Sequence, residues 1–97
     1  MTIITLTTDL GTNDSYLASI KGAIYSQIEK VKIVDISNKI EPFNILQAAY
    51  VVRNCFKDFP IGTVHIISVD DELSTTNEHL AVKAHGHYFI GADNGLF

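Results

Sequence analysis

The order of strand and helix patterns along the chain constrains the fold more than any other feature of the sequence. Three runs rich in β-branched and apolar residues, Thr2 to Thr8, Val31 to Ile36 and Thr63 to Val69, are separated by two amphipathic stretches. Runs of this kind are typical of buried strands, and apolar residues at every third or fourth position are typical of helices. The alternation therefore predicts an α/β, mostly parallel sheet with a β-α-β-α-β start and right-handed crossovers.

The helix boundaries and the end of the chain add detail to this prediction. The first helix is expected to follow Asp14, with Thr12 or Asp14 capping its first turn. The second is expected over Asn44 to Phe56, just after Pro42. The third strand is continuous and apolar enough to be central, and the segments "LAVKA" and "HYFIGA", joined by "HGH", predict a hairpin.

Composition narrows the classes of function. The chain has 97 residues and a net charge of -4, whereas a nucleic-acid-binding domain or a binder of anionic membranes would show a basic face. No apolar run approaches the roughly 20 residues that cross a bilayer, and no leader pattern precedes the first strand, so the expected location is the cytoplasm. The single cysteine, Cys55, lies in an apolar helical run and is expected to be a small core residue.

Acids follow the predicted strands at the points where ligands gather in α/β sheets. Asp9, Asp35 and Asp70 are each placed at or just after a strand end. A carboxylate there can accept two hydrogen bonds from a vicinal diol such as a ribose, and the helix N-terminus that follows can hold an anion. The residues alone leave a second interpretation open, in which Asp9 only closes a turn and Asp14 only caps the helix.

The histidines and the acidic run suggest no other chemistry. The H-x-H pair of His85 and His87 lacks a cysteine or a second acid at a metal-ligand spacing, so both side chains are expected to be solvated and no metal is expected. His65 alternates with apolar residues and is expected to be packed rather than to act as a base. The run from Asp70 to Glu72 is expected to form a solvated turn, although it could hold a cation.

Four segments together resemble a known family. They are "TLTTDLGTNDSYLASIKG", "VDISNKIEPFNILQAAYVV", "FPIGTVHIISVDDE" and "FIGADNGLF". In order and spacing they resemble the N-terminal domain of the S-adenosyl-L-methionine (SAM) hydroxide adenosyltransferases, adenosine-forming hydrolases related to the fluorinase and chlorinase. The resemblance implies that residues 1–97 are an incomplete N-terminal SAM- and adenosine-binding domain, and that the C-terminal β-barrel of this two-domain family is absent here. It further implies a homotrimer that hydrolyses SAM to adenosine and methionine without a cofactor.

The resemblance also implies roles for individual residues. Asp9 matches the acid that holds the ribose hydroxyls, and Asp70 matches the catalytic acid that positions or activates water together with an Arg and a downstream His. The remaining implied substrate-binding residues are Asp14, Ser15 and Tyr16 toward the methionine end, Phe43 near the ligand, and Asp93 and Asn94 in the block close to the end.

The chain departs from the family pattern at several positions. The Arg is replaced by Asn77, the usual His after "VDIS" by Asn38, and the Pro of the last block by Ala92. Loss of the Arg leaves open a non-catalytic SAM or adenosine binder, and a structural assembly domain without a ligand is a further alternative. Halide-dependent adenosyl transfer is less favoured, because the carboxylate of Asp70 would repel an anion.

Overall fold

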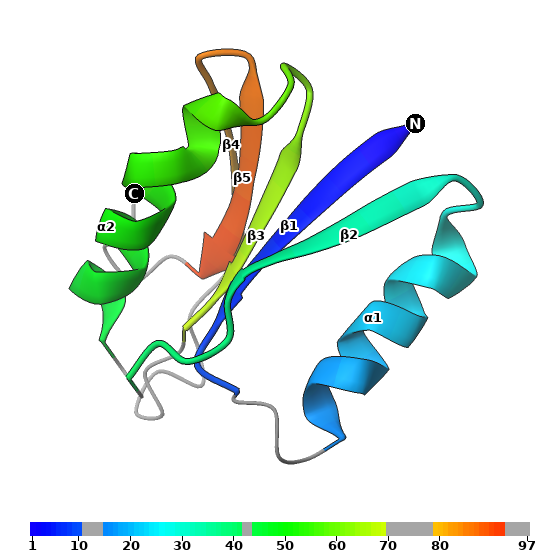
Figure 1. The fold of residues 1–97 in the computed structure, drawn as a ribbon, viewed down its shortest axis with the longest axis horizontal. Coiled ribbons are helices and arrows are strands. Elements are labelled where there is room, and N and C mark those ends of the chain that lie inside the picture. Colours follow the sequence, from blue (N-terminus) through cyan, green and yellow to red (C-terminus); the bar gives the residue numbers. More distant parts are fainter. Residues whose placement is uncertain (11–14, 42–43, 70–78, 93–97) are drawn as a thin grey trace.

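The computed structural model describes residues 1–10, 15–41, 44–69 and 79–92, and its element order matches the predicted one (Figure 1). The β-α-β-α-β start and the hairpin that follows it are both confirmed. The elements are β1 (Thr2–Thr8), α1 (Tyr16–Gln27), β2 (Val31–Ser37), α2 (Ile45–Cys55), a short 3₁₀ helix η1 (Phe56–Asp58), β3 (Val64–Ser68), β4 (His79–Ala84) and β5 (His87–Ala92).

The strands form a single five-stranded sheet in the order β2-β1-β3-β5-β4. All neighbouring pairs are parallel except β4 with β5, so the predicted mostly parallel sheet and the central place of β3 are confirmed. The carboxyl ends of β1, β2, β3 and β5 therefore lie along one edge of the sheet, the lower edge in Figure 1. This edge is where an α/β sheet can hold a ligand.

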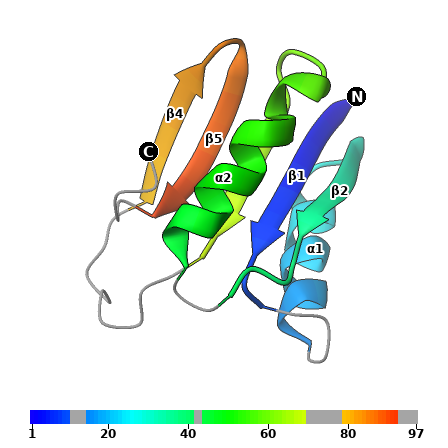
Figure 2. The same ribbon diagram turned by 60° about the vertical axis from the view of Figure 1, so that its left-hand side comes forward.

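The two helices cover opposite faces of the sheet (Figure 2). Because β2 and β3 lie on opposite sides of β1, two right-handed crossovers must place α1 and α2 on different faces. On one face Leu17 of α1 packs with Ile4 and Leu6 of β1. On the other face Ala48 and Val52 of α2 belong to a second cluster that includes residues of β3 and β5. Neither helix in the described part of the chain is long and apolar enough to cross a membrane.

The helix starts differ from each other in how they are capped. The N-cap position of α1 is Ser15, whose side chain makes no cap hydrogen bond, and the predicted capping residues Thr12 and Asp14 lie outside the described residues. The N-cap of α2 is Asn44, whose Oδ1 accepts a hydrogen bond from the backbone N–H of Gln47 at 2.9 Å. A side-chain bond of this type satisfies one of the N–H groups that a helix start leaves without a partner.

The β4–β5 hairpin is closed by a two-residue turn that demands glycine. His85 and Gly86 both have positive φ, 53° and 79°, which is the conformation of a type I′ turn. A Cβ atom on Gly86 would lie 2.9 Å from Cγ2 of Ile61, so both the backbone conformation and the available space disfavour a larger residue.

Candidate ligand site at the carboxyl edge of the sheet

The structure places three of the predicted site residues at the start of the chain's first crossover. Asp9 directly follows β1 and is partly exposed. Ser15 and Tyr16 begin α1 and are exposed, Tyr16 to 66%. Since β1 leads into α1, all three belong to the segment that leaves the carboxyl edge (Figure 1). The other predicted site residues, Asp14, Phe43, Asp70, Asp93 and Asn94, lie outside the described residues.

Asp9 stands in a tight turn between the ends of β1 and β3. Its backbone N–H donates to the carbonyl oxygen of Ser68 at 3.4 Å. The N–H of Leu10 returns to Oγ1 of Thr8 at 3.3 Å, which closes a short ring around Asp9. The chain leaves β1 toward β2 on one side and returns as β3 on the other, so this turn lies at the topological switch point of the sheet. A partly exposed carboxylate at this point can accept hydrogen bonds from a diol.

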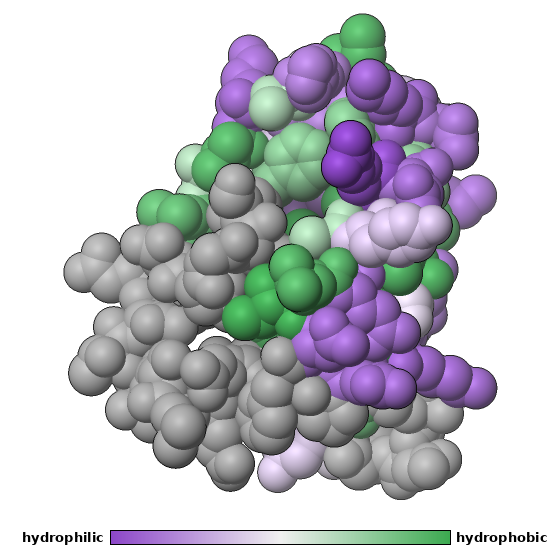
Figure 3. Space-filling model, turned by 90° about the vertical axis from the view of Figure 1, so that its left-hand side faces the viewer, coloured by the Kyte–Doolittle hydropathy of each residue, from purple (hydrophilic) through white to green (hydrophobic). Residues whose placement is uncertain are grey.

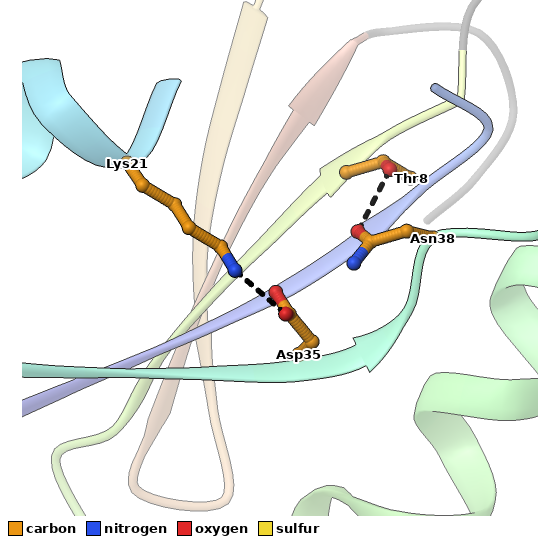
Figure 4. A network of polar contacts seen from close by, with 4 residues as sticks. All are labelled: Thr8, Lys21, Asp35 and Asn38. Carbon is orange, nitrogen blue, oxygen red and sulfur yellow. Dashed lines mark hydrogen bonds and ion pairs between the residues drawn. The ribbon is translucent and has the colours of Figure 1, made fainter. Parts of the chain in front are cut away.

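Thr8 and Asn38 hold this turn through side-chain hydrogen bonds. The sequence analysis gave Thr8 no role. The side chain of Thr8 is fully buried, and its Oγ1 donates to Oδ1 of Asn38 at 2.9 Å (Figure 4). The backbone N–H of Ile40 donates to the carbonyl oxygen of Thr8 at 3.2 Å. A threonine in a β-branched run indicates only a strand, so no sequence signal distinguishes Thr8 from Thr5 or Thr7.

A β-bulge brings Asn38 to this position. The register between β1 and β2 changes from Leu6 opposite Asp35 to Thr7 opposite Ser37, which leaves Ile36 as the extra residue. A bulge bends its strand and turns the following side chains. The residues after it therefore cross the end of β1, and Asn38 comes to lie against Thr8 with only 8% of its surface exposed.

Asp35 does not belong to the candidate site, and the prediction that placed it at a strand end is wrong. It lies inside β2, before the bulge. Its Oδ2 forms an ion pair with Nζ of Lys21 in α1 at 2.7 Å (Figure 4). Both side chains are about one third exposed, 32% and 39%, so this is a surface contact between helix and strand.

His65 and His87 form part of the core, near the amino ends of β3 and β5 and away from the carboxyl edge. His65 is fully buried, as predicted, with Nδ1 2.7 Å from Oγ1 of Thr5 and Nε2 3.2 Å from Nδ1 of His87. His87 is only 3% exposed, so the prediction of a solvated pair is wrong for His87 and correct for the exposed His85. Burial, together with the neighbouring His87, lowers the pKa of His65 to about 4. A neutral imidazole near the amino end of β3 has no part in the candidate site.

The described residues contain neither a reactive thiol nor a metal site besides the candidate ligand site. Cys55 is partly buried, and its Sγ donates to the carbonyl oxygen of Val51 at 3.4 Å. Burial and then the charge of Asp58 raise the pKa of this thiol, so it stays protonated and unreactive. Among the described residues, no three His, Cys, Asp or Glu side chains are grouped so that they could hold a metal ion.

An open α/β sheet with an acid at its switch point is the class of domain in which ligands bind beyond the carboxyl ends of the strands. Comparison with known proteins gives the particular family. Residues 4–97 match the family model described as the SAM hydroxide adenosyltransferase N-terminal domain, and the chain belongs to this family.

Similar proteins agree with this assignment. The chain is 41% identical to an (R)-S-adenosyl-L-methionine hydrolase of Methanocaldococcus jannaschii, over 98% of the chain but 38% of that protein. It is 33% identical to a fluorinase of Actinopolyspora mzabensis, over 84% of the chain and 27% of that protein. An uncharacterized conserved protein from Thermotoga maritima has a similar structure, with a TM-score of 0.90 and 32% identity over 97% of this chain and 36% of that one. The chain thus spans well under half of the proteins it resembles.

Proposed function

We propose that the full-length protein to which this chain belongs hydrolyses SAM to adenosine and L-methionine. The observation that carries the proposal is the turn after β1, which holds a partly exposed Asp9 at the switch point of the sheet in a chain of this family. Relatives from Methanocaldococcus jannaschii and Thermus thermophilus, the second 31% identical over 92% of the chain, are named (R)-S-adenosyl-L-methionine hydrolases.

The proposed reaction is an in-line displacement at the ribose C5′. Water attacks C5′, the C5′–O bond forms as the C5′–S bond breaks, and the bonding electrons pass to sulfur while one proton leaves for solvent. The sulfonium of SAM becomes a neutral thioether, so the leaving group needs no metal. The task of the protein is to align water opposite the C–S bond and to exclude other water.

The residues divide this task. Asp9 accepts hydrogen bonds from the ribose 2′ and 3′ hydroxyls, and Asp70 positions the attacking water. Asn77 in place of an arginine means that Asp70 works without that cation here. The other substrate contacts are assigned to Asp14, Ser15 and Tyr16 toward the methionine end, to Phe43 near the adenosyl group, and to Asp93 and Asn94.

We place residues 1–97 in the N-terminal domain of a cytoplasmic homotrimer. The face formed by α2 and the β4–β5 hairpin supports an assembled state, because apolar side chains are exposed on it among polar ones (Figure 3). Leu46 and Tyr50, one turn apart on α2, are 83% and 64% exposed. Beside α2 a groove of about 540 Å³ has Phe56 and Phe89 among its lining residues. Apolar surface of this kind is typical of contacts with another subunit or domain.

The test is to incubate the full-length protein with SAM at neutral pH and to separate the products by chromatography. Equal amounts of adenosine and methionine, above the uncatalysed background, are expected. A 5′-halogenated nucleoside in the presence of halide would instead make the protein a halide-dependent transferase.

Asn77 in the place of the arginine favours one second candidate, a SAM or adenosine binder without turnover. The same sample distinguishes it. Adenosine that raises the melting temperature while no products form would identify the binder, and the absence of both effects would contradict both functions.

A further inference from the structure

A series of two hydrogen bonds connects the Asp9 turn to the residue that follows β2. It runs from the backbone N–H of Leu10 through the hydroxyl of Thr8 to the side chain of Asn38. The backbone N–H of Leu10 can only donate, so Oγ1 of Thr8 must accept from it at 3.3 Å. The hydroxyl proton of Thr8 is then directed to the side chain of Asn38 at 2.9 Å, where only the amide oxygen can accept it. The Asn38 amide lies with Oδ1 toward Thr8.

The surroundings make this series rigid. Thr8 is fully buried and Asn38 is 8% exposed, so water has little access to the bond between them. The backbone on both sides is held as well, because Ile40 donates to the carbonyl oxygen of Thr8 and Asp9 donates to that of Ser68. With the rotamer of Thr8 fixed, the Leu10 N–H is held back over the strand end, and Asp9 is kept at the apex of the turn.

We propose that Asn38 is a positioning residue of the adenosyl site, acting through Thr8 to fix the turn that presents Asp9. This inference rests on the proposed function, since it assumes that Asp9 holds the ribose. Asn38 touches neither the ribose nor the reacting atoms. Its contribution is to bind the Thr8 hydroxyl before the ligand arrives, so that the ligand does not have to order the turn.

The proposal predicts a particular kinetic signature. The ribose is held in the same way in the ground state and in the transition state, so a loosened Asp9 weakens both equally. Such a loss raises KM with little change in kcat. A residue with a structural role alone would lower the melting temperature and leave the adenosine affinity of the folded protein unchanged.

The experiment uses the full-length protein with the variants Asn38→Leu, Thr8→Val, their combination, and Thr8→Ser. The matched control is Thr63→Val. Thr63 is another buried threonine, 2% exposed, whose hydroxyl donates to the carbonyl oxygen of Pro60 at 2.6 Å before the start of β3, at the opposite edge of the sheet. The adenosine Kd is measured by calorimetry, and kcat and KM are measured with SAM, all well below each variant's melting temperature.

Asn38→Leu and Thr8→Val are each expected to raise the adenosine Kd and the KM for SAM about fivefold to tenfold, the effect of one buried hydrogen bond. The double variant is expected to be no weaker than Thr8→Val, because Asn38 acts only through that hydroxyl. Thr8→Ser keeps the hydroxyl and should retain the affinity. Thr63→Val should lose stability and keep the affinity.

Three results would overturn the inference: an unchanged Kd in Asn38→Leu, additive effects in the double variant, or an equal loss of affinity in Thr63→Val. Adenosine binding without SAM turnover by the unsubstituted protein would refute the proposed hydrolysis alone, and the Kd series would still decide the role of Asn38. No adenosine binding by the unsubstituted protein would refute both.

Discussion

Lowering the pH should destabilise the protein through one residue, His65. This imidazole is fully buried between Thr5 and His87, and its pKa is lowered from 6.5 to about 4. The unfolded chain therefore binds a proton between pH 6.5 and about 4 that the folded chain does not bind. Stability from the neutral His65 is fully present above pH 6.5 and is lost as the pH falls toward 4.

The size of the effect follows from the shift. The shift in the pKa of His65 contributes about 3 kcal/mol to the free energy of unfolding when the imidazole is neutral. About 2 kcal/mol of this contribution is lost between roughly pH 7.5 and 5. The measurement is urea unfolding at the two pH values, for the unsubstituted protein and for His65→Phe.

His65→Phe should lower the stability at both pH values, because Thr5 and His87 lose a partner, and it should lose most of the pH dependence. The matched control is His85→Asn, at an exposed turn position with φ of 53° that asparagine tolerates. This control should keep the full dependence. A His65→Phe variant as sensitive to pH as the unsubstituted protein would refute the reasoning.

Four further substitutions test the site and the fold. Asp9→Ala should weaken adenosine binding by about 2 kcal/mol, measured by calorimetry, if its carboxylate holds both ribose hydroxyls; an unchanged affinity would remove it from the site. Leu6→Ala should cost about 3 kcal/mol in urea unfolding, because Leu6 is fully buried in β1. Gly86→Ala should cost about 1 kcal/mol or more, since the turn has φ of 79° and Ile61 occupies the space; a neutral result would contradict the turn geometry. Lys21→Ala should change the melting temperature little, as a loss under about 1 kcal/mol is typical of an exposed ion pair.

The element order could be predicted because it depends on local periodicity. The runs that became β1, β2 and β3 are five to seven residues long and rich in β-branched and apolar residues, which is too short for a typical helix and typical of a strand. The central place of β3 followed from its continuous apolar character, whereas its pairing with β1 was not predicted. The start of α1 at Tyr16 agrees with a helix expected to follow Asp14, whereas local pattern did not single out Ser15 as the N-cap position.

Contacts between distant segments could not be predicted. The bond between Thr8 and Asn38 joins residues 30 positions apart and depends on a bulge in β2. Asp35 lies outside the site because its carboxylate pairs with Lys21 of α1, a contact between segments that local pattern does not reveal. His87 is buried because β5 pairs with β3, a partner that its own sequence does not indicate. The assignments of Asp70 and of the residues around it remain predictions.

The place of β1 in the middle of the sheet has a consequence for how the chain folds. Thr5 meets His65 across sixty positions of sequence, whereas the β4–β5 hairpin closes over two residues. During synthesis, β1 can therefore pair with β3, one of its two neighbours in the sheet, only after β3 has been made. Hairpins close quickly, but parallel pairing between remote segments is slow because a long loop must be closed first. We expect this late pairing to limit the folding rate, and the edge of β1 that has not yet paired with β3 to be prone to aggregation until then.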